Sequence, residues 1–235
     1  MRLTFFVASA ALLLGGCTTS GTKDAKDSAG AMPAAAAGAP STSADADRQT
    51  GGSGLPAGYV GRTDNPSAPL TGARYTASGD GWEVVTGPAH IIYSDKNVAS
   101  GSYTASATVD QLEKPAHPEA YGIFIGGKNL DKPTQAYTYF LVRGTGELAV
   151  KVREGDKTRD VLTWTGASGV PKEDAAGKAS YALAVQVTGD AVKLLVNGKQ
   201  VASVSKVGLP TDGITGLRIN HNLHVRVSPV SVKTS

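Results

Sequence analysis

Residues 178–204 decide the fold and read KASYALAVQVTGDAVKLLVNGKQVASV. Apolar and polar residues alternate along this stretch, which is typical of half-buried β-strands. The pairs Gly189-Asp190 and Asn197-Gly198 interrupt the alternation, and both are signals for two-residue hairpin turns. The pattern therefore predicts three antiparallel strands joined by two tight turns.

One register satisfies both turns and places the apolar residues on one face. The predicted pairs are Val187 with Val192, Val185 with Leu194, Leu183 with Val196 and, across the second turn, Leu194 with Val201. A slip of one residue would move the whole apolar set to the other face of the sheet. The second turn is predicted to be of type I′, which requires positive φ at both central residues.

A second hairpin is predicted in QAYTYFLVRGTGELAVKVRE, residues 135–154. A three-residue loop, 144–146, pairs Arg143 with Glu147. This register puts Phe140 opposite Val150 on the core side, together with the pair Val142 and Leu148. The other face carries Tyr139 across from Lys151, Tyr137 across from Arg153, and Leu141 over Ala149.

The remaining chain from about Tyr59 shows the same period-two pattern, with turn signals every ten residues or so. Further predicted strands are GWEVV, AHIIYS, SYTASATV, AYGIFIGG and a closing pair in GLRINHNLHVRVSPVSV, which brings the total to eleven or twelve. Such spacing is typical of all-β proteins. Residues 59–235 are therefore predicted to form one antiparallel two-sheet sandwich.

The chain begins with a secretory signal. Arg2 precedes an apolar run, 3–14, that is too short to span a membrane, for which roughly 20 residues are needed. Residues 1–16 are therefore interpreted as a signal peptide. Residues 17–58 are rich in Ala, Gly, Ser, Thr, Pro and Asp, and such a composition cannot bury enough apolar surface to offset chain entropy. This segment is predicted to be a disordered tether.

The single cysteine stands at the end of the signal. Leu14-Gly15-Gly16-Cys17 resembles the lipobox of bacterial lipoproteins. The resemblance implies cleavage before Cys17, a diacylglycerol on its thiol and anchoring in the cell envelope. Thr18, rather than Asp, follows the cysteine, and by the rules of that family this favours the outer membrane. The alternative is an ordinary cleaved signal in which Cys17 has no such role.

The predicted strands also resemble a known family. AYGIFIGG, YTYFLVR with GELAVKV, VKLLVNGKQVASV and DGITGLRI are similar to concanavalin A-like or LamG-like jelly rolls, near the bacterial group of 3-keto-disaccharide hydrolase domains. The resemblance covers roughly residues 79–235. It implies two curved antiparallel sheets, with glycan sites on the concave face. An Asn-Ser-Gly-Ile-like segment of the hydrolases is replaced here by YGIFIGG, which argues against hydrolase activity.

Composition and motifs exclude several kinds of function. The formal charge is only +3, from 23 basic and 20 acidic residues, so no nucleic-acid partner is expected. The Glu-x-Asp-x-x-Glu string of related glucanases and the Gly-x-Ser-x-Gly elbow of hydrolases are absent from the sequence. His221 and His224 lie three residues apart, so they point to opposite faces of an extended strand and are interpreted as lining a turn. We expect no cofactor and no metal site.

The face of the second hairpin that carries tyrosines and cations is the best candidate for a binding site. Tyrosine rings stack on the apolar CH faces of sugar rings, and lysine or arginine side chains pair with acidic groups of a ligand. Arg218 and Asn220 join this face, because Leu217 and Ile219 take the core side. The candidate ligand-binding residues are Tyr137, Tyr139, Lys151, Arg153, Arg218 and Asn220. Ordinary cross-strand packing of tyrosine against long cations explains the same pattern.

The sequence therefore favours an envelope-anchored lipoprotein that carries a non-catalytic carbohydrate- or ligand-binding sandwich. The alternatives are a hydrolase-like domain that acts on a modified disaccharide, and a structural envelope protein. Neither the ligand nor any protein partner can be predicted from the sequence.

Overall fold

The structure, a computed structural model, describes residues 54–235. The predicted signal peptide, Cys17 and most of the predicted tether lie outside the described residues. Fifteen strands and one short 3₁₀ helix, Leu70–Gly72, make up the regular structure of this part of the chain. No helix in residues 54–235 has the length and apolarity to cross a membrane.

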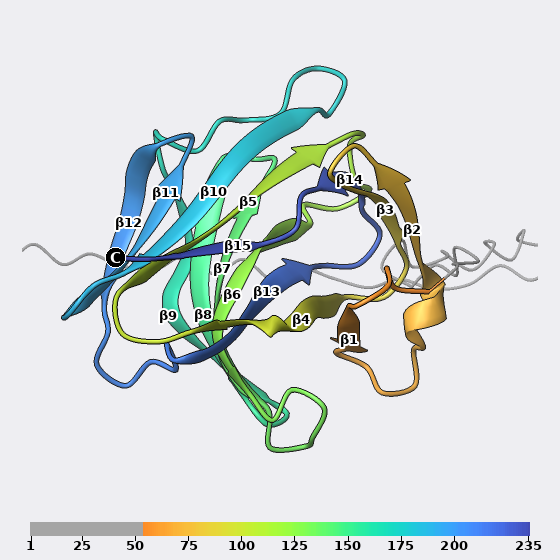
Figure 1. Ribbon diagram of the computed structural model, residues 1–235. Coiled ribbons are helices and arrows are strands. Elements are labelled where there is room, and N and C mark those ends of the chain that lie inside the picture. Colours follow the sequence, from red (N-terminus) through yellow and green to blue (C-terminus); the bar gives the residue numbers. More distant parts are fainter. Residues whose placement is uncertain (1–53) are drawn as a thin grey trace, which may run out of the picture. The chain divides into compact units, whose positions relative to one another are not determined.

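The strands form two antiparallel sheets that face each other (Figure 1). In spatial order, the seven-stranded sheet contains β1 (Val60–Thr63), β4 (His90–Ala99), β13 (Gly213–Ile219), β6 (Ala120–Lys128), β7 (Ala136–Arg143), β8 (Glu147–Glu154) and β9 (Lys157–Gly166). The eight-stranded sheet contains β12 (Lys199–Ser205), β11 (Ala191–Val196), β10 (Ala179–Val187), β5 (Tyr103–Gln111), β14 (His224–Val227), β3 (Gly81–Thr86) and β2 (Ala73–Ser78), with β15 (Ser231–Thr234) paired to β5. The predicted two-sheet jelly-roll sandwich is confirmed.

The three-stranded unit of residues 178–204 forms β10, β11 and β12. All three pairs predicted across the first turn are present, including Val187 with Val192. Asn197 and Gly198 have φ values of 50° and 79°, as a type I′ turn requires. The predicted pairing of Leu194 with Val201 is wrong, because a β-bulge after Leu194 shifts the register and brings Ala202 opposite it.

The second predicted hairpin, β7–β8, has the predicted register along its whole length. Arg143 pairs with Glu147, Phe140 with Val150 and Tyr139 with Lys151. Gly146 closes the loop with a φ of 84°, a conformation that favours glycine.

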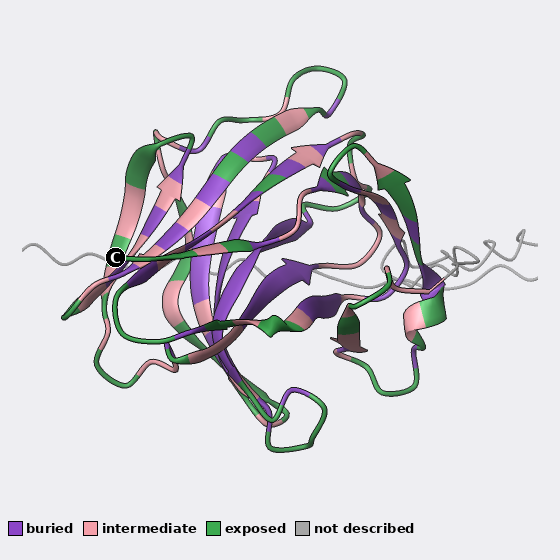
Figure 2. Cartoon of the chain, in the orientation of Figure 1, coloured by how far each residue is buried: buried purple, intermediate pink, exposed green. Residues whose placement is uncertain are grey.

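The main core fills the space between the two sheets, and Figure 2 shows the central strands of both as largely buried. Phe140, Val150 and Leu217 contribute from the seven-stranded sheet, and Val185 and Leu194 from the eight-stranded sheet. These side chains alternate with residues that point away from the other sheet. The candidate site lies on that outward face of the seven-stranded sheet.

Candidate functional site

The outward face of the seven-stranded sheet carries its own apolar layer. Its members are Ile91, Tyr93, Ala120, Phe124, Leu130, Tyr137, Tyr139 and Leu141, all buried. The aromatic rings pack edge to face or tilted, and the ring centroids of Phe124 and Tyr137 are 5.2 Å apart. This layer is the floor on which the polar groups of the site lie.

Arg218 is the central polar residue of this face. It lies on β13, between the core residues Leu217 and Ile219, and only 6% of it is exposed. Its two terminal nitrogens donate to the two carboxylate oxygens of Asp64, and the Nη1–Oδ1 distance is 2.5 Å. Such a bidentate pair fixes the direction of both groups, and burying the guanidinium without it would be costly.

The pair holds both groups in their charged forms. Burial alone would raise the pKa of Asp64, but the hydrogen bonds and charge of Arg218 outweigh burial and lower the pKa of that carboxyl. Burial likewise opposes the charge on Arg218, yet Asp64 raises the pKa of the guanidinium. The site therefore contains a fixed anion and a fixed cation.

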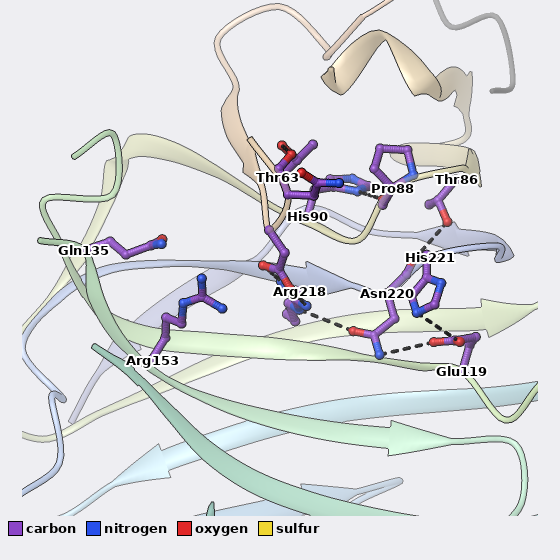
Figure 3. Close-up of polar contacts among 12 residues, drawn as sticks. Thr63, Thr86, Pro88, His90, Glu119, Gln135, Arg153, Arg218, Asn220 and His221 are labelled. Atoms are coloured by element: carbon purple, nitrogen blue, oxygen red, sulfur yellow. Dashed lines mark hydrogen bonds and ion pairs between the residues drawn. The ribbon is translucent and has the colours of Figure 1, made fainter. Parts of the chain in front are cut away.

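A chain of hydrogen bonds continues from Arg218 along the end of the sheet (Figure 3). Arg218 Nε donates to Asn220 Oδ1 over 3.3 Å, and Asn220 Nδ2 donates to Glu119 Oε2 over 3.3 Å. The other oxygen of Glu119, Oε1, lies 3.3 Å from His221 Nε2. Within residues 54–235, every buried side-chain nitrogen and oxygen has a hydrogen-bond partner.

A pocket of ≈ 250 Å³ opens at this network. It is lined by Asp64, Asn65, Ala89, Arg218, Asn220 and His221. These residues come from the ends of β1 and β13 and from the start of β4, three strands that are neighbours in the sheet. The strand order thus brings together groups that are far apart in the sequence.

His90, the first residue of β4, supports the pocket from the core side. It is fully buried, and burial lowers its pKa to about 4. Its Nδ1 donates to the Pro88 carbonyl over 2.9 Å, and its Nε2 accepts a hydrogen bond from the Tyr75 hydroxyl. His90, which lies on the core side of the pocket, is therefore neutral at neutral pH.

Tyr137 and Tyr139, two of the predicted ligand-binding residues, are buried rather than open to solvent. Tyr137 is 2% and Tyr139 is 6% exposed. Their ring centroids are 5.4 Å apart, and the Arg218 guanidinium carbon lies 5.7 Å from the centroid of Tyr139. Alternation predicted the correct side of the sheet, but neighbouring rings and Arg218 cover the two tyrosines.

The two predicted cations on β8 differ in their surroundings. Lys151 Nζ lies 2.7 Å from the carboxylate of Asp160 on β9, so this lysine is engaged in an ion pair. Arg153 Nε donates to the Gly155 carbonyl over 2.8 Å, and its charge contributes to lowering the pKa of Asp64. Figure 3 shows Arg153 and Gln135 on the side of Arg218 away from Asn220.

The structure thus brings together Tyr139, Arg218 and Asn220, places Tyr137 and Arg153 beside them, and directs Lys151 elsewhere. The sequence did not reveal Asp64, Glu119 or the role of His221. Each is a charged or imidazole residue within two positions of a strand end, and this position is the one signal that the sequence carries.

His221 lies in the turn after β13, whereas His224 begins β14, and the two histidines contact different carboxylates. His221 contacts Glu119, whereas His224 Nε2 lies 2.8 Å from Glu83 Oε1 on β3 of the other sheet. Among residues 54–235, no cluster of three or more His, Cys, Asp or Glu side chains is arranged to hold a metal ion.

Comparison with known proteins shows the fold. No known protein-family profile and no curated protein sequence matches the chain. Among solved structures it is similar to the carbohydrate-binding module CBM66 from Bacillus subtilis, with a TM-score of 0.55, 14% identity, and 75% of this chain and 96% of that one covered. It is also similar to the GH16 protein of the Bacteroides ovatus mixed linkage glucan PUL in complex with a G4G4G3G product. Here the TM-score is 0.53 with 7% identity, covering 78% of this chain and 98% of that one. The chain thus has a jelly-roll β-sandwich fold.

Proposed function

We propose that this protein is a non-catalytic carbohydrate-binding module, held in the bacterial cell envelope by a lipid on Cys17. The observation that carries the binding role is the buried Arg218, clamped by Asp64 at the wall of an open pocket. Burying a charged group such as this guanidinium costs free energy. Small-molecule binding sites typically contain a few polar groups that are held in place and point toward the ligand.

The chemistry of the pocket suits a ligand with many hydroxyls. A hydroxyl both donates and accepts hydrogen bonds. Asp64 supplies an acceptor that stays ionised, Arg218 supplies donors, and the Asn220 amide supplies one of each. Because bonds within the protein fix these groups before a ligand arrives, little side-chain entropy is lost on binding.

Asp64 is poorly suited to glycoside hydrolysis. That reaction needs a carboxyl that stays protonated as the general acid, opposite a second carboxylate. The bidentate contact with Arg218 instead lowers the pKa of Asp64. This favours binding without turnover.

Hydrolase-like action on a modified disaccharide is the second candidate. Glu119 supports it, because this second carboxylate belongs to the same network. The sandwich shared with the GH16 protein is consistent with it. Release of monosaccharide from any glycan, abolished in Glu119→Gln, would favour this candidate over simple binding.

The anchoring role rests on the lipobox-like Leu14-Gly15-Gly16-Cys17. Stable anchoring requires more than one acyl chain, which lipoprotein processing at a cysteine supplies. In cells fed a labelled fatty acid, the wild-type chain should carry label and Cys17→Ser should carry none. Equal labelling of both proteins would refute the anchor.

Binding is tested by calorimetry of the purified full chain against a glycan panel. The panel contains neutral fragments of β-glucan, xylan, arabinan and mannan and acidic fragments of alginate and pectin, each as a disaccharide and a hexasaccharide. At least one should bind, and Asn220→Ala should weaken it about tenfold, the effect of losing one or two hydrogen bonds. Gln200→Ala, an exposed amide on β12, is the matched control and should change nothing. Absence of binding across the panel would refute the proposal.

A further inference from the structure

The pocket beside Arg218 is one of three that follow the order of the strands along one end of the seven-stranded sheet. A second pocket, of ≈ 180 Å³, is lined by residues 114–119 before β6, by residues 144–145 in the β7–β8 turn and by Glu173. A third, of ≈ 660 Å³, is lined by residues 145–147 at the β7–β8 turn and by residues from segment 166–172 after β9. The order of the three pockets follows the spatial order of the strands, which is β4, β13, β6, β7, β8, β9.

Shared residues join neighbouring pockets. Thr145 lines both the second and the third pocket. Glu119 lines the second pocket and bonds to Asn220 and His221, which line the first. The pockets are therefore adjacent along one surface. From β4 to β9 there are five strand spacings of about 4.8 Å, so the row extends over about 24 Å.

Each pocket contains a carboxylate that is matched by a cation. Asp64 binds Arg218 in the first, Glu173 lies 3.6 Å from Lys114 in the second, and Glu147 lies 2.7 Å from Arg143 beside the third.

The charges along the row therefore balance. The carboxylates are those of Asp64, Glu119, Glu147 and Glu173, and the cations are those of Lys114, Arg143, Lys172 and Arg218. A row of donors and acceptors with balanced charge matches the hydroxyls of an uncharged sugar chain and gives an acidic chain no net attraction.

We infer that the three pockets form one groove for an uncharged oligosaccharide, laid across the strand ends from β4 to β9. The inference rests on the proposed binding function and specifies its ligand as an extended neutral chain. The end at Arg218 is the buried, more strongly fixed part of the groove, and the third pocket is its open end.

Ser168→Trp tests the groove away from Arg218. Ser168 is exposed and lines the third pocket, so an indole there obstructs the open end without entering the core. Ser203→Trp places the same ring on an exposed position of β12, outside the groove, and serves as the matched control. Calorimetry uses the glycan panel described above, with each fragment as a disaccharide and a hexasaccharide.

For a neutral glycan, the hexasaccharide should bind at least tenfold more tightly than the disaccharide. Ser168→Trp should abolish that gain and leave disaccharide affinity unchanged, whereas Ser203→Trp should leave both affinities unchanged. Raising the salt from 0.05 to 0.5 M should have less than a twofold effect. Equal affinity for both lengths, an unaffected gain in Ser168→Trp, or tighter binding of the alginate or pectin fragments would overturn the groove while leaving the proposed function intact. Failure of every fragment to bind would instead refute the proposed function itself.

Discussion

Breaking the pair between Asp64 and Arg218 should destabilise the fold strongly, and the cost can be worked from the structure. In Asp64→Ala, the guanidinium of Arg218 stays in place with 6% exposure and loses both carboxylate contacts. Removing one partner of a buried ion pair costs about 3–5 kcal/mol. The Asp64 side chain is 35% exposed, so water reaches part of the vacated space and the expected cost is about 3 kcal/mol, the lower end of that range.

Removing both charges should cost less than the two single losses together. Arg218→Met keeps the long apolar stem over Tyr139 but leaves the Asp64 carboxylate without its main partner. In the double variant neither charge is stranded. The coupling free energy in a double-mutant cycle should therefore reach about 2 kcal/mol, within the range for residues in direct contact.

Urea unfolding followed by the fluorescence of Trp82 and Trp164 measures these free energies. The cycle needs equal m-values in all four proteins, because a changed m-value signals a change in compactness. Additive changes in the free energy of unfolding would show that Asp64 and Arg218 do not stabilise each other. A loss of less than about 1 kcal/mol in Asp64→Ala would show the same, since exposed ion pairs contribute no more than that.

Three further predictions concern the scaffold of the site. Burial lowers the pKa of His90 from an unfolded value near 6.5 to about 4. The unfolded chain therefore binds more protons between these pH values, and the free energy of unfolding should fall by about 3 kcal/mol as the pH drops from 6.5 to 4. Measured by urea unfolding at several pH values, His90→Gln should flatten this dependence, and an unchanged slope would contradict the assignment. Gly198→Val forces a β-branched residue to a φ of 79° and should cost about 1–2 kcal/mol, whereas Lys199→Ala should cost almost nothing; equal melting temperatures would argue against the type I′ turn. Tyr139→Ala removes a buried ring and should destabilise the fold by about 3–5 kcal/mol; a loss below about 1 kcal/mol would mean that the ring is exposed.

The sequence was sufficient for the parts of the fold that depend on alternation and turn chemistry. The β7–β8 register followed from a three-residue loop, and the β10–β11 register from Gly189-Asp190. The bulge after Leu194 was not predicted, although Val201 and Val204 of β12 are three residues apart and so break the alternation where the extra residue lies.

Three strands, β1, β2 and β9, were not predicted from the alternation of apolar and polar residues. β1 has only four residues, and β2 and β9 lie at the edges of their sheets, where many side chains are exposed. A periodic apolar pattern arises only where one face of a strand is buried, so exposed edge strands show it weakly.

The candidate site was predicted only in part, for a related reason. Alternation placed Tyr139 and Arg218 on one face, but it does not show what lies above that face. Asp64 is 154 residues from Arg218 in the chain and follows the unrecognised strand β1. The ion pair of Asp64 with Arg218 therefore depends on the order of the strands in the sheet, and the alternation of apolar and polar residues does not predict that order.

The central claim is that glycans bind at Arg218, and nuclear magnetic resonance of its side chain tests this claim most directly. The tightest-binding neutral hexasaccharide of the panel is titrated into the ¹⁵N-labelled full chain. The Arg218 Nε–H and Asn220 side-chain amide signals should shift and saturate together, at the ligand concentration at which calorimetry shows saturation. Saturable binding that leaves both signals unmoved, with shifts confined to other residues, would contradict the account.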